Sequence, residues 1–191
     1  MEFRIGDRVL YYRQSTAWNL PGHAHFLTFS CYQRRPYLKS QTCCEWLCAA
    51  IRSACDSEKF KLWAYVFMPE HVHVLVFPSR PDYSMALFLK KLKLPVVRRV
   101  HSRLKRDHTD FLNRTAPGKS FHFWQAGGGH DLNICSWDKV VEKAEFCHLN
   151  PVKRGLVVSA DAWRWSSFRW LALGDRSNAP LQLDDWDDSF G

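Results

Sequence analysis

The chain has 191 residues, of which 46% are hydrophobic and 15% aromatic, a composition that excludes a disordered protein and allows one domain with a sizeable core. No apolar run approaches the roughly 20 residues of a membrane-spanning helix, and residues 1–7 lack the apolar segment of a signal peptide. We therefore expect a cytoplasmic protein with no membrane partner. The net charge of +8 favours a polyanionic partner, of which nucleic acid is the usual one.

The first half of the chain predicts a strand, a helix and a strand hairpin. Residues 23–32 alternate in character and are rich in aromatics, which is typical of a strand. Residues 41–57 have the periodicity of an amphipathic helix. Two further strand-like runs, 62–68 and 71–77, are separated only by Pro69 and Glu70, which indicates a tight hairpin.

The second half begins with a helix from Ser84, a plausible N-cap, to about Arg106. Pro95 should kink or split this helix. Residues 121–125 predict a short fourth strand, and the three glycines at 127–129 predict a flexible loop.

A last long helix is expected from Trp137 to about Leu149, with Ser136 as its cap. Asn150 should end it, because the residue before a proline is pushed out of the helical region. The order strand, helix, strand, strand, helix, strand, helix predicts an α+β protein with a ferredoxin-like split βαβ antiparallel sheet. We expect helices on one face and the final helix on the other side, near the histidines.

Two histidines lie two residues apart in the second hairpin strand. Residues two apart in a strand point the same way, so His71 and His73 project together, each with a ring nitrogen free for a divalent metal. Leu75 and Phe77 share their face, while valines at 72, 74 and 76 face the other way. Both faces therefore look covered, and a buried histidine pair needs partners. The alternative is that the two histidines are ordinary surface polar positions.

A third metal ligand is expected from Asn150, whose side-chain oxygen suits magnesium or manganese. Phe146 is four residues earlier and shares its helix face. The alternative reading of Asn150 is an ordinary helix terminator before Pro151.

Basic residues cluster in the helix that follows the hairpin, and the chain ends in a run of acidic ones. The cluster predicts a phosphate-binding stripe, and its alternative is a solvated helix face. The acidic run, residues 184–188, has two readings: it folds back on the basic groove, or it is a solvated tail. The basic residues are Lys90, Lys91, Lys93, Arg98, Arg99, Arg103, Lys105 and Arg106.

Taken together, these residues resemble a known family. Residues 67–76, with His71-Val72-His73, look like the His-hydrophobe-His signature of single-tyrosine transposases. Residues 150–157, Asn-Pro-Val-Lys-Arg-Gly-Leu-Val, resemble the closing motif of the branch called REP-associated tyrosine transposases. Residues 20–23, 123–125 and 161–167 also fit that branch, so the resemblance spans about residues 20–173 of one expected domain, with an acidic tail over about 175–191.

The resemblance implies a ferredoxin-like fold of HUH-endonuclease topology. It implies binding of single-stranded or hairpin DNA, often a repetitive extragenic palindrome (REP), and cleavage through a covalent phosphotyrosine with Mg²⁺ or Mn²⁺ as cofactor. The metal ligands would be His71, His73 and Asn150. The DNA contacts would include the basic stripe together with Lys153 and Arg154 of the closing motif.

Phe146 occupies the position of the family's catalytic tyrosine, one helical turn before Asn150. Phenylalanine has the shape but no hydroxyl, so it cannot form the covalent link. No tyrosine follows Tyr83, so a shifted alignment would not supply one. His130, after the three glycines, also departs from the family, whose members often carry Tyr there.

Three explanations are open. The chain is a natural binding-only derivative of a transposase, or another group acts as nucleophile, or a tyrosine was exchanged for phenylalanine to trap a complex. For the second, His130 on its glycine loop is the most interesting group, with Tyr65 and Tyr83 as others. Our leading hypothesis is a DNA-binding, nucleoid-associated member of the transposase family with impaired cleavage, as a monomer or homodimer. The alternative is a non-catalytic DNA-hairpin-binding regulator. An RNA-binding ferredoxin-like module would instead expose aromatics where this chain has its histidine pair.

Overall fold

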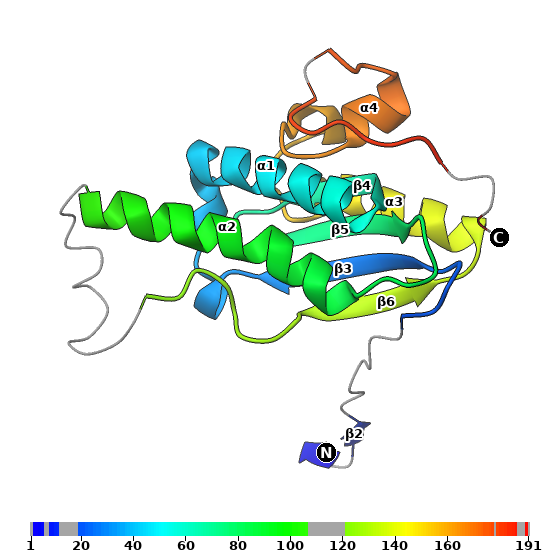
Figure 1. Cartoon of the computed structure of the whole chain (residues 1–191), viewed down its shortest axis with the longest axis horizontal. Coiled ribbons are helices and arrows are strands. Elements are labelled where there is room, and N and C mark those ends of the chain that lie inside the picture. Colours follow the sequence, from blue (N-terminus) through cyan, green and yellow to red (C-terminus); the bar gives the residue numbers. More distant parts are fainter. Residues whose placement is uncertain are drawn as a thin grey trace.

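The protein was analysed as a computed structural model, which describes residues 2–5, 8–11, 19–106, 121–177, 179–186 and 190. The predicted α+β fold is confirmed: a four-stranded antiparallel sheet has the order β4-β5-β3-β6 (Figure 1). Its strands are β3 (Ala24–Ser30), β4 (Phe60–Phe67), β5 (His71–Pro78) and β6 (His130–Ile134). A separate two-stranded ribbon is made of β1 (Glu2–Ile5) and β2 (Arg8–Tyr11).

In the described part of the chain, four α-helices accompany the sheet: α1 (Gln41–Glu58), α2 (Met85–Arg106), α3 (Trp137–Lys153) and the short α4 (Phe168–Leu173). Single 3₁₀ turns lie at Tyr32–Arg34, Tyr37–Lys39 and Ala160–Ala162. The predicted cap of α2 is confirmed, because the Leu87 amide donates to the Ser84 hydroxyl at 3.3 Å. Within the described ranges, no helix has the length and apolarity to cross a membrane.

The alternation of β5 places helices on both faces of the sheet. Val72, Val74 and Val76 belong to a core shared with α1 and α2, which lie side by side over that face (Figure 1). Leu75 and Phe77 belong to a second core with the buried residues of α3. The expectation that the last long helix lies on the histidine side is therefore confirmed.

The predicted fourth strand at 121–125 is wrong. Of that segment only Trp124 forms an isolated bridge, to Cys31. The fourth strand is β6, which pairs with β3 from Ala24–Ile134 to Thr28–His130. Its sequence, His-Asp-Leu-Asn-Ile, has only two apolar residues, and β6 is an edge strand with both His130 and Leu132 exposed. An edge strand that is half exposed to solvent needs few hydrophobic residues, so its sequence is hard to identify as a strand.

Both helices that contain a proline continue past it, so α2 is not split at Pro95, and α3 does not end where it was expected to. α2 is unbroken through Pro95, because Phe88 and Leu92 before the proline and Val96 and Val100 after it all pack into the same core. α3 runs through Asn150 and Pro151 to Lys153, rather than ending at Leu149. Packing along a helix outweighs the loss of one backbone hydrogen bond at proline.

Two C-terminal segments cover the outer edge of β4. Ser167 pairs with Tyr65, whose amide donates to the Ser167 hydroxyl at 3.0 Å and whose carbonyl accepts the Ser167 amide at 3.0 Å. Further along, the Leu62 amide donates to the Asp184 carboxylate at 2.8 Å, and the Asp184 amide donates back to the Leu62 carbonyl at 3.0 Å. An edge strand with its backbone groups satisfied in this way is protected from pairing with other chains.

The acidic C-terminal run follows neither of the two readings given to it. Asp184 forms an ion pair with Arg52 of α1 at 3.0 Å, not with α2. Trp186 stacks on Trp137 at the start of α3, with ring centroids 5.0 Å apart, and Phe190 is only 2% exposed. The segment is thus packed against the domain across the β4 edge, while residues 187 and 188 lie outside the described residues.

Candidate metal and DNA site

His71 and His73 point from β5 towards α3 and converge. Both are nearly buried, at 6% and 5% exposure, and their Nε2 atoms are 3.1 Å apart. Their rings are almost perpendicular, at 85°. The two-residue repeat of a strand predicted that the two histidines share a face. The convergence of their Nε2 atoms depends on the groups that contact their Nδ1 atoms.

Each histidine is oriented through its Nδ1 atom. His71 Nδ1 lies 3.0 Å from the Glu70 carboxylate, which can only accept, so the ring carries its proton on Nδ1 and leaves a lone pair on Nε2. His73 Nδ1 lies 2.8 Å from the hydroxyl of Thr28. For His71 this is the arrangement in which a second group fixes the tautomer of a metal-binding histidine, whereas the Thr28 hydroxyl, which can donate or accept, orients the ring of His73.

Neither partner was predicted. Glu70 directly precedes the histidines, so its position alone could have drawn attention to it. Thr28 carries no sequence signal, because its contact depends on the register that places it opposite His73 in the β3–β5 ladder.

Burial and charge leave both imidazoles neutral and Glu70 ionised at pH 7. Burial, with a contribution from His71, lowers the pKa of His73 to about 3, and burial also lowers the pKa of His71. For Glu70, burial raises the carboxyl pKa, but its bonds to His71 and to Arg154, 3.0 Å away, outweigh this and lower it. Neutral nitrogens beside a fixed negative charge are suited to a cation.

The two nitrogens also have the separation that one ion requires. Two ligands about 2.1 Å from an octahedral ion, at right angles, are about 3.0 Å apart, against 3.1 Å between the Nε2 atoms. In the described part of the chain, no group of three His, Cys, Asp or Glu could hold a metal. The Asn150 amide is a candidate third ligand of another type, because it lies 3.3 Å from His73 Nε2 through its nitrogen. Turning that amide over would present its oxygen instead.

Phe146 lies against this pair. Its ring centroid is 5.2 Å from that of His73, edge to face at 82°, and 6.0 Å from that of Phe26. The side chain is 39% exposed, and the Lys153 ammonium lies 6.0 Å above its ring. A reacting group at this position would thus be open to a ligand at the histidines, but the ring carries no hydroxyl.

Comparisons with known proteins agree with this geometry. The family model described as "Transposase IS200 like" matches residues 20–136, more than half of the chain. The chain belongs to the IS200-like transposase family. The match includes both histidines but ends before α3, so Phe146 and Asn150 lie outside it.

Among solved structures, this transposase-family chain is similar to a REP-associated tyrosine transposase bound to a REP hairpin. The identity is 21%, the TM-score is 0.66, and the alignment covers 95% of this chain and 96% of the other, which shows a shared HUH-type fold. A candidate transposase from Deinococcus radiodurans R1 aligns at 16% identity over 72% of this chain and 95% of its own, with a TM-score of 0.44, too low to support an argument. No curated protein matches the sequence.

The predicted basic stripe does not lie at the histidine site of this transposase-family chain. α2 packs on the opposite face of the sheet, through the core that contains Val72 and Val74. There Lys91 pairs with Glu58, and Lys93 donates to the carbonyls of Gly127 and Gly128 at 3.2 and 3.3 Å. The Asn-Pro motif places two cations near the site, Lys153 over Phe146 and Arg154 beside Glu70.

His130 is not carried on a flexible loop. It begins β6 and pairs with Thr28, so it shares the histidine face but is separated from His73 by one strand, about 10 Å at 4.8 Å per strand spacing. Gly129 before it is locked, with φ of +87°, and a Cβ there would lie 2.2 Å from the Thr28 carbonyl oxygen. Reaching the Nε2 pair would need the strand to move.

The two tyrosines named as other nucleophiles lie on the wrong face. Tyr65 is fully buried in the core beneath α1 and α2. The Tyr83 hydroxyl is bonded to His25 at 2.7 Å and donates to the Leu20 carbonyl at 2.9 Å. Burial raises the pKa of Tyr83 to about 12, which makes it a poorer nucleophile still.

Proposed function

We propose that this IS200-like transposase-family protein binds single-stranded or hairpin DNA of the repetitive extragenic palindrome type with the help of a divalent ion, and that it does not cleave DNA through a tyrosine. The observation that carries the proposal is the pair of Nε2 atoms 3.1 Å apart beside the hydroxyl-free ring of Phe146. The site therefore retains what a phosphate-binding metal needs and lacks what covalent attack needs.

In this proposal His71, His73 and Asn150 hold Mg²⁺ or Mn²⁺. When bound, the ion would polarise a phosphodiester oxygen. Lys153 and Arg154 supply positive charge to the DNA backbone at the exposed edge of the site, and Glu70 fixes the tautomer of His71. Binding to DNA would place the protein at the nucleoid. The proposed ligands all come from one chain, so the proposed site suits a monomer or a homodimer.

A second candidate function is a DNA-hairpin-binding regulator that has no use for a metal. The missing hydroxyl at Phe146 favours it. The two candidates differ in one respect: a regulator of this kind should bind DNA equally well with and without divalent ions.

Substitution of His71→Ala tests the proposal directly. We expect binding of wild-type protein to a single strand carrying a REP-type hairpin to weaken at least tenfold when Mn²⁺ is replaced by EDTA. We expect His71→Ala to bind as weakly in Mn²⁺ as wild type does in EDTA, because a single imidazole cannot replace the pair. Fluorescence anisotropy with labelled DNA gives both dissociation constants.

His122→Ala is a matched control, since this histidine is exposed and does not belong to a strand of the sheet. It should retain the wild-type response to Mn²⁺. Equal affinity of wild type in Mn²⁺ and EDTA would contradict the proposal and favour the metal-free regulator.

Glu70→Gln tests how the site is oriented. The amide oxygen of the variant still accepts a hydrogen bond from His71 Nδ1. The substitution removes the negative charge of the Glu70 carboxylate, whose oxygen lies 3.0 Å from that nitrogen. Loss of such a supporting group typically weakens metal binding by roughly 10–100-fold, so we expect a Mn²⁺ dissociation constant at least tenfold higher by isothermal titration calorimetry without DNA. The exposed Glu45→Gln should leave it unchanged, and an unchanged value for Glu70→Gln would remove Glu70 from the site.

A further inference from the structure

The Glu70 carboxylate is shared between a histidine and an arginine at the edge of the site. Its Oε1 atom lies 3.0 Å from His71 Nδ1 and also 3.0 Å from Arg154 Nη1. One oxygen therefore orients a candidate metal ligand and neutralises a cation at the same time. Its negative charge cannot act fully on both, because a neighbouring guanidinium reduces the field that the carboxylate exerts on the imidazole.

The two partners of this ion pair differ in their freedom to move. The Glu70 side chain is 11% exposed, and the Glu70 carbonyl accepts a hydrogen bond from the Cys31 amide at 2.9 Å. The Arg154 side chain is 48% exposed and stands at the C-cap of α3. Ion pairs with a solvent-exposed partner are weak, so another anion can compete for the guanidinium. Arg154 is therefore the side chain that can leave the pair.

Arg154 is also connected to the other side of the site. Its amide donates to the Asn150 carbonyl at 3.0 Å, so the backbone links it to the candidate third ligand. A guanidinium has five N–H donors in a planar fork that matches two oxygens of a phosphate. A phosphate at the histidines would therefore offer Arg154 a second anion besides Glu70.

We propose that Arg154 exchanges partners, from Glu70 in the free protein to a DNA phosphate in the complex, and that this exchange couples metal binding to DNA binding. The inference rests on the proposed function for both ligands. A cation at the histidines would compensate the charge of Glu70 across the ring of His71, and so weaken the hold of Glu70 on Arg154. A phosphate that draws Arg154 away would return the full charge of Glu70 to His71. Each ligand then favours the other by the same factor, as thermodynamic linkage requires.

Arg154→Gln without DNA tests whether Arg154 and the metal compete for Glu70. We expect the variant to bind Mn²⁺ about threefold more tightly than wild type by isothermal titration calorimetry, because Glu70 no longer shares its charge. In a Glu70→Gln background the same change should alter the Mn²⁺ dissociation constant by less than about twofold, since no carboxylate charge is released. Weaker Mn²⁺ binding in Arg154→Gln would show that Arg154 supports the site, which would overturn the inference.

Fluorescence anisotropy with a labelled single strand that carries a REP-type hairpin tests the coupling itself. The quantity of interest is the ratio of the DNA dissociation constants in EDTA and in Mn²⁺, which the proposed function sets at about 10 or more for wild type. We expect Arg154→Gln to lower this ratio about threefold, chiefly by weakening binding in Mn²⁺, because in EDTA Arg154 stays on Glu70. A cation that only attracts the DNA backbone would weaken binding equally in both buffers, and an unchanged ratio would overturn the inference.

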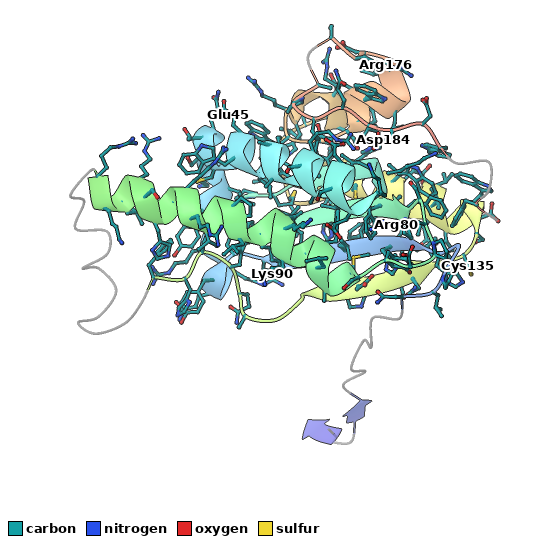
Figure 2. The ribbon with its side chains drawn as sticks, in the orientation of Figure 1. Glu45, Arg80, Lys90, Cys135, Arg176 and Asp184 are labelled. Carbon is teal, nitrogen blue, oxygen red and sulfur yellow. The ribbon has the colours of Figure 1, made fainter. Side chains whose placement is uncertain are left out.

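Arg80→Gln is the matched control for the loss of an arginine. Arg80 is 45% exposed and pairs with Asp82 beyond the carboxyl end of β5 (Figure 2). His71 begins that strand, so roughly 23 Å of strand separates the control from the site. Arg80→Gln should match wild type in both measurements. If it lowers the ratio as much as Arg154→Gln does, only the overall charge matters and the exchange is overturned.

Arg154→Lys separates charge from the loss of the side chain. It keeps a cation on Glu70, so it should bind Mn²⁺ within about twofold of wild type in the absence of DNA. A gain in Mn²⁺ affinity as large as that of Arg154→Gln would contradict the role of the charge and overturn the inference.

The wild-type ratio distinguishes failure of this inference from failure of the proposed function. A wild-type ratio near one overturns the proposed function, and the coupling with it. A wild-type ratio of about 10 or more that Arg154→Gln leaves unchanged overturns only the exchange of partners, and the proposed function stands.

Discussion

Phe146→Tyr is expected to form a covalent protein–DNA adduct on single-stranded DNA that carries a REP-type hairpin, in Mn²⁺, whereas the wild-type chain forms none. The new hydroxyl would project from a ring whose centroid is 5.2 Å from that of His73, at a side chain that is 39% exposed. In the reaction its oxygen bonds to phosphorus, the sugar oxygen leaves with a proton, and the strand is cut. The adduct is measured as a band that survives denaturing electrophoresis.

Two controls separate position from chemistry. Val141→Tyr adds a hydroxyl at another exposed position of α3, away from the histidines, and should form no adduct. Adding His73→Ala to Phe146→Tyr should abolish the adduct, because reaction needs the metal pair. An adduct with the wild-type chain would contradict the loss of cleavage and show that another residue acts as the nucleophile.

Removal of residues 181–191 is expected to destabilise the whole domain. These residues bury Leu181, Leu183 and Phe190, and Asp184 bonds to the backbone of β4 at Leu62. Large-to-small changes of single buried residues cost about 2–5 kcal/mol, so the loss of several should cost at least about 5 kcal/mol. For a protein of this size that lowers the melting temperature by roughly 10–20 °C, which differential scanning calorimetry will detect.

Trp186→Ala provides the comparison within that segment. Its ring stacks on Trp137, but it is 40% exposed, so its loss should lower the melting temperature by only a few degrees. A truncated protein that melts within 3 °C of the full chain would show that the segment only rests on the surface.

Local pattern predicted most of the elements and half of the site. The alternation of residues 71–77 placed both histidines on one face, and helical spacing placed Phe146 with Asn150, which the structure bears out in position. The same local reasoning was wrong for the strand at 121–125 and for the end of α3 before Pro151. In those cases tertiary packing decided: β6 is held by its ladder to β3, and α3 by buried Asn150 and Pro151.

The Thr28 partner of His73 could not be predicted from the sequence, because their contact depends on how two distant strands pair. Thr28 lies 45 residues before His73 and meets it only because β3 and β5 pair in one register. A shift of that register by one residue would turn Thr28 to the other face. The face of the sheet on which α2 packs likewise depends on contacts between residues far apart in the chain.

The sequence by itself determined the family-type motifs, the shared face of His71 and His73, and the absence of a hydroxyl at position 146. These features depend on which residue stands at each position and on the repeat of side-chain direction along a strand or a helix. Only the tertiary structure decided that the two imidazoles converge to 3.1 Å and that the α2 cations face away from them. Both depend on which elements pack on which face, and that choice is made by contacts between residues far apart in the chain.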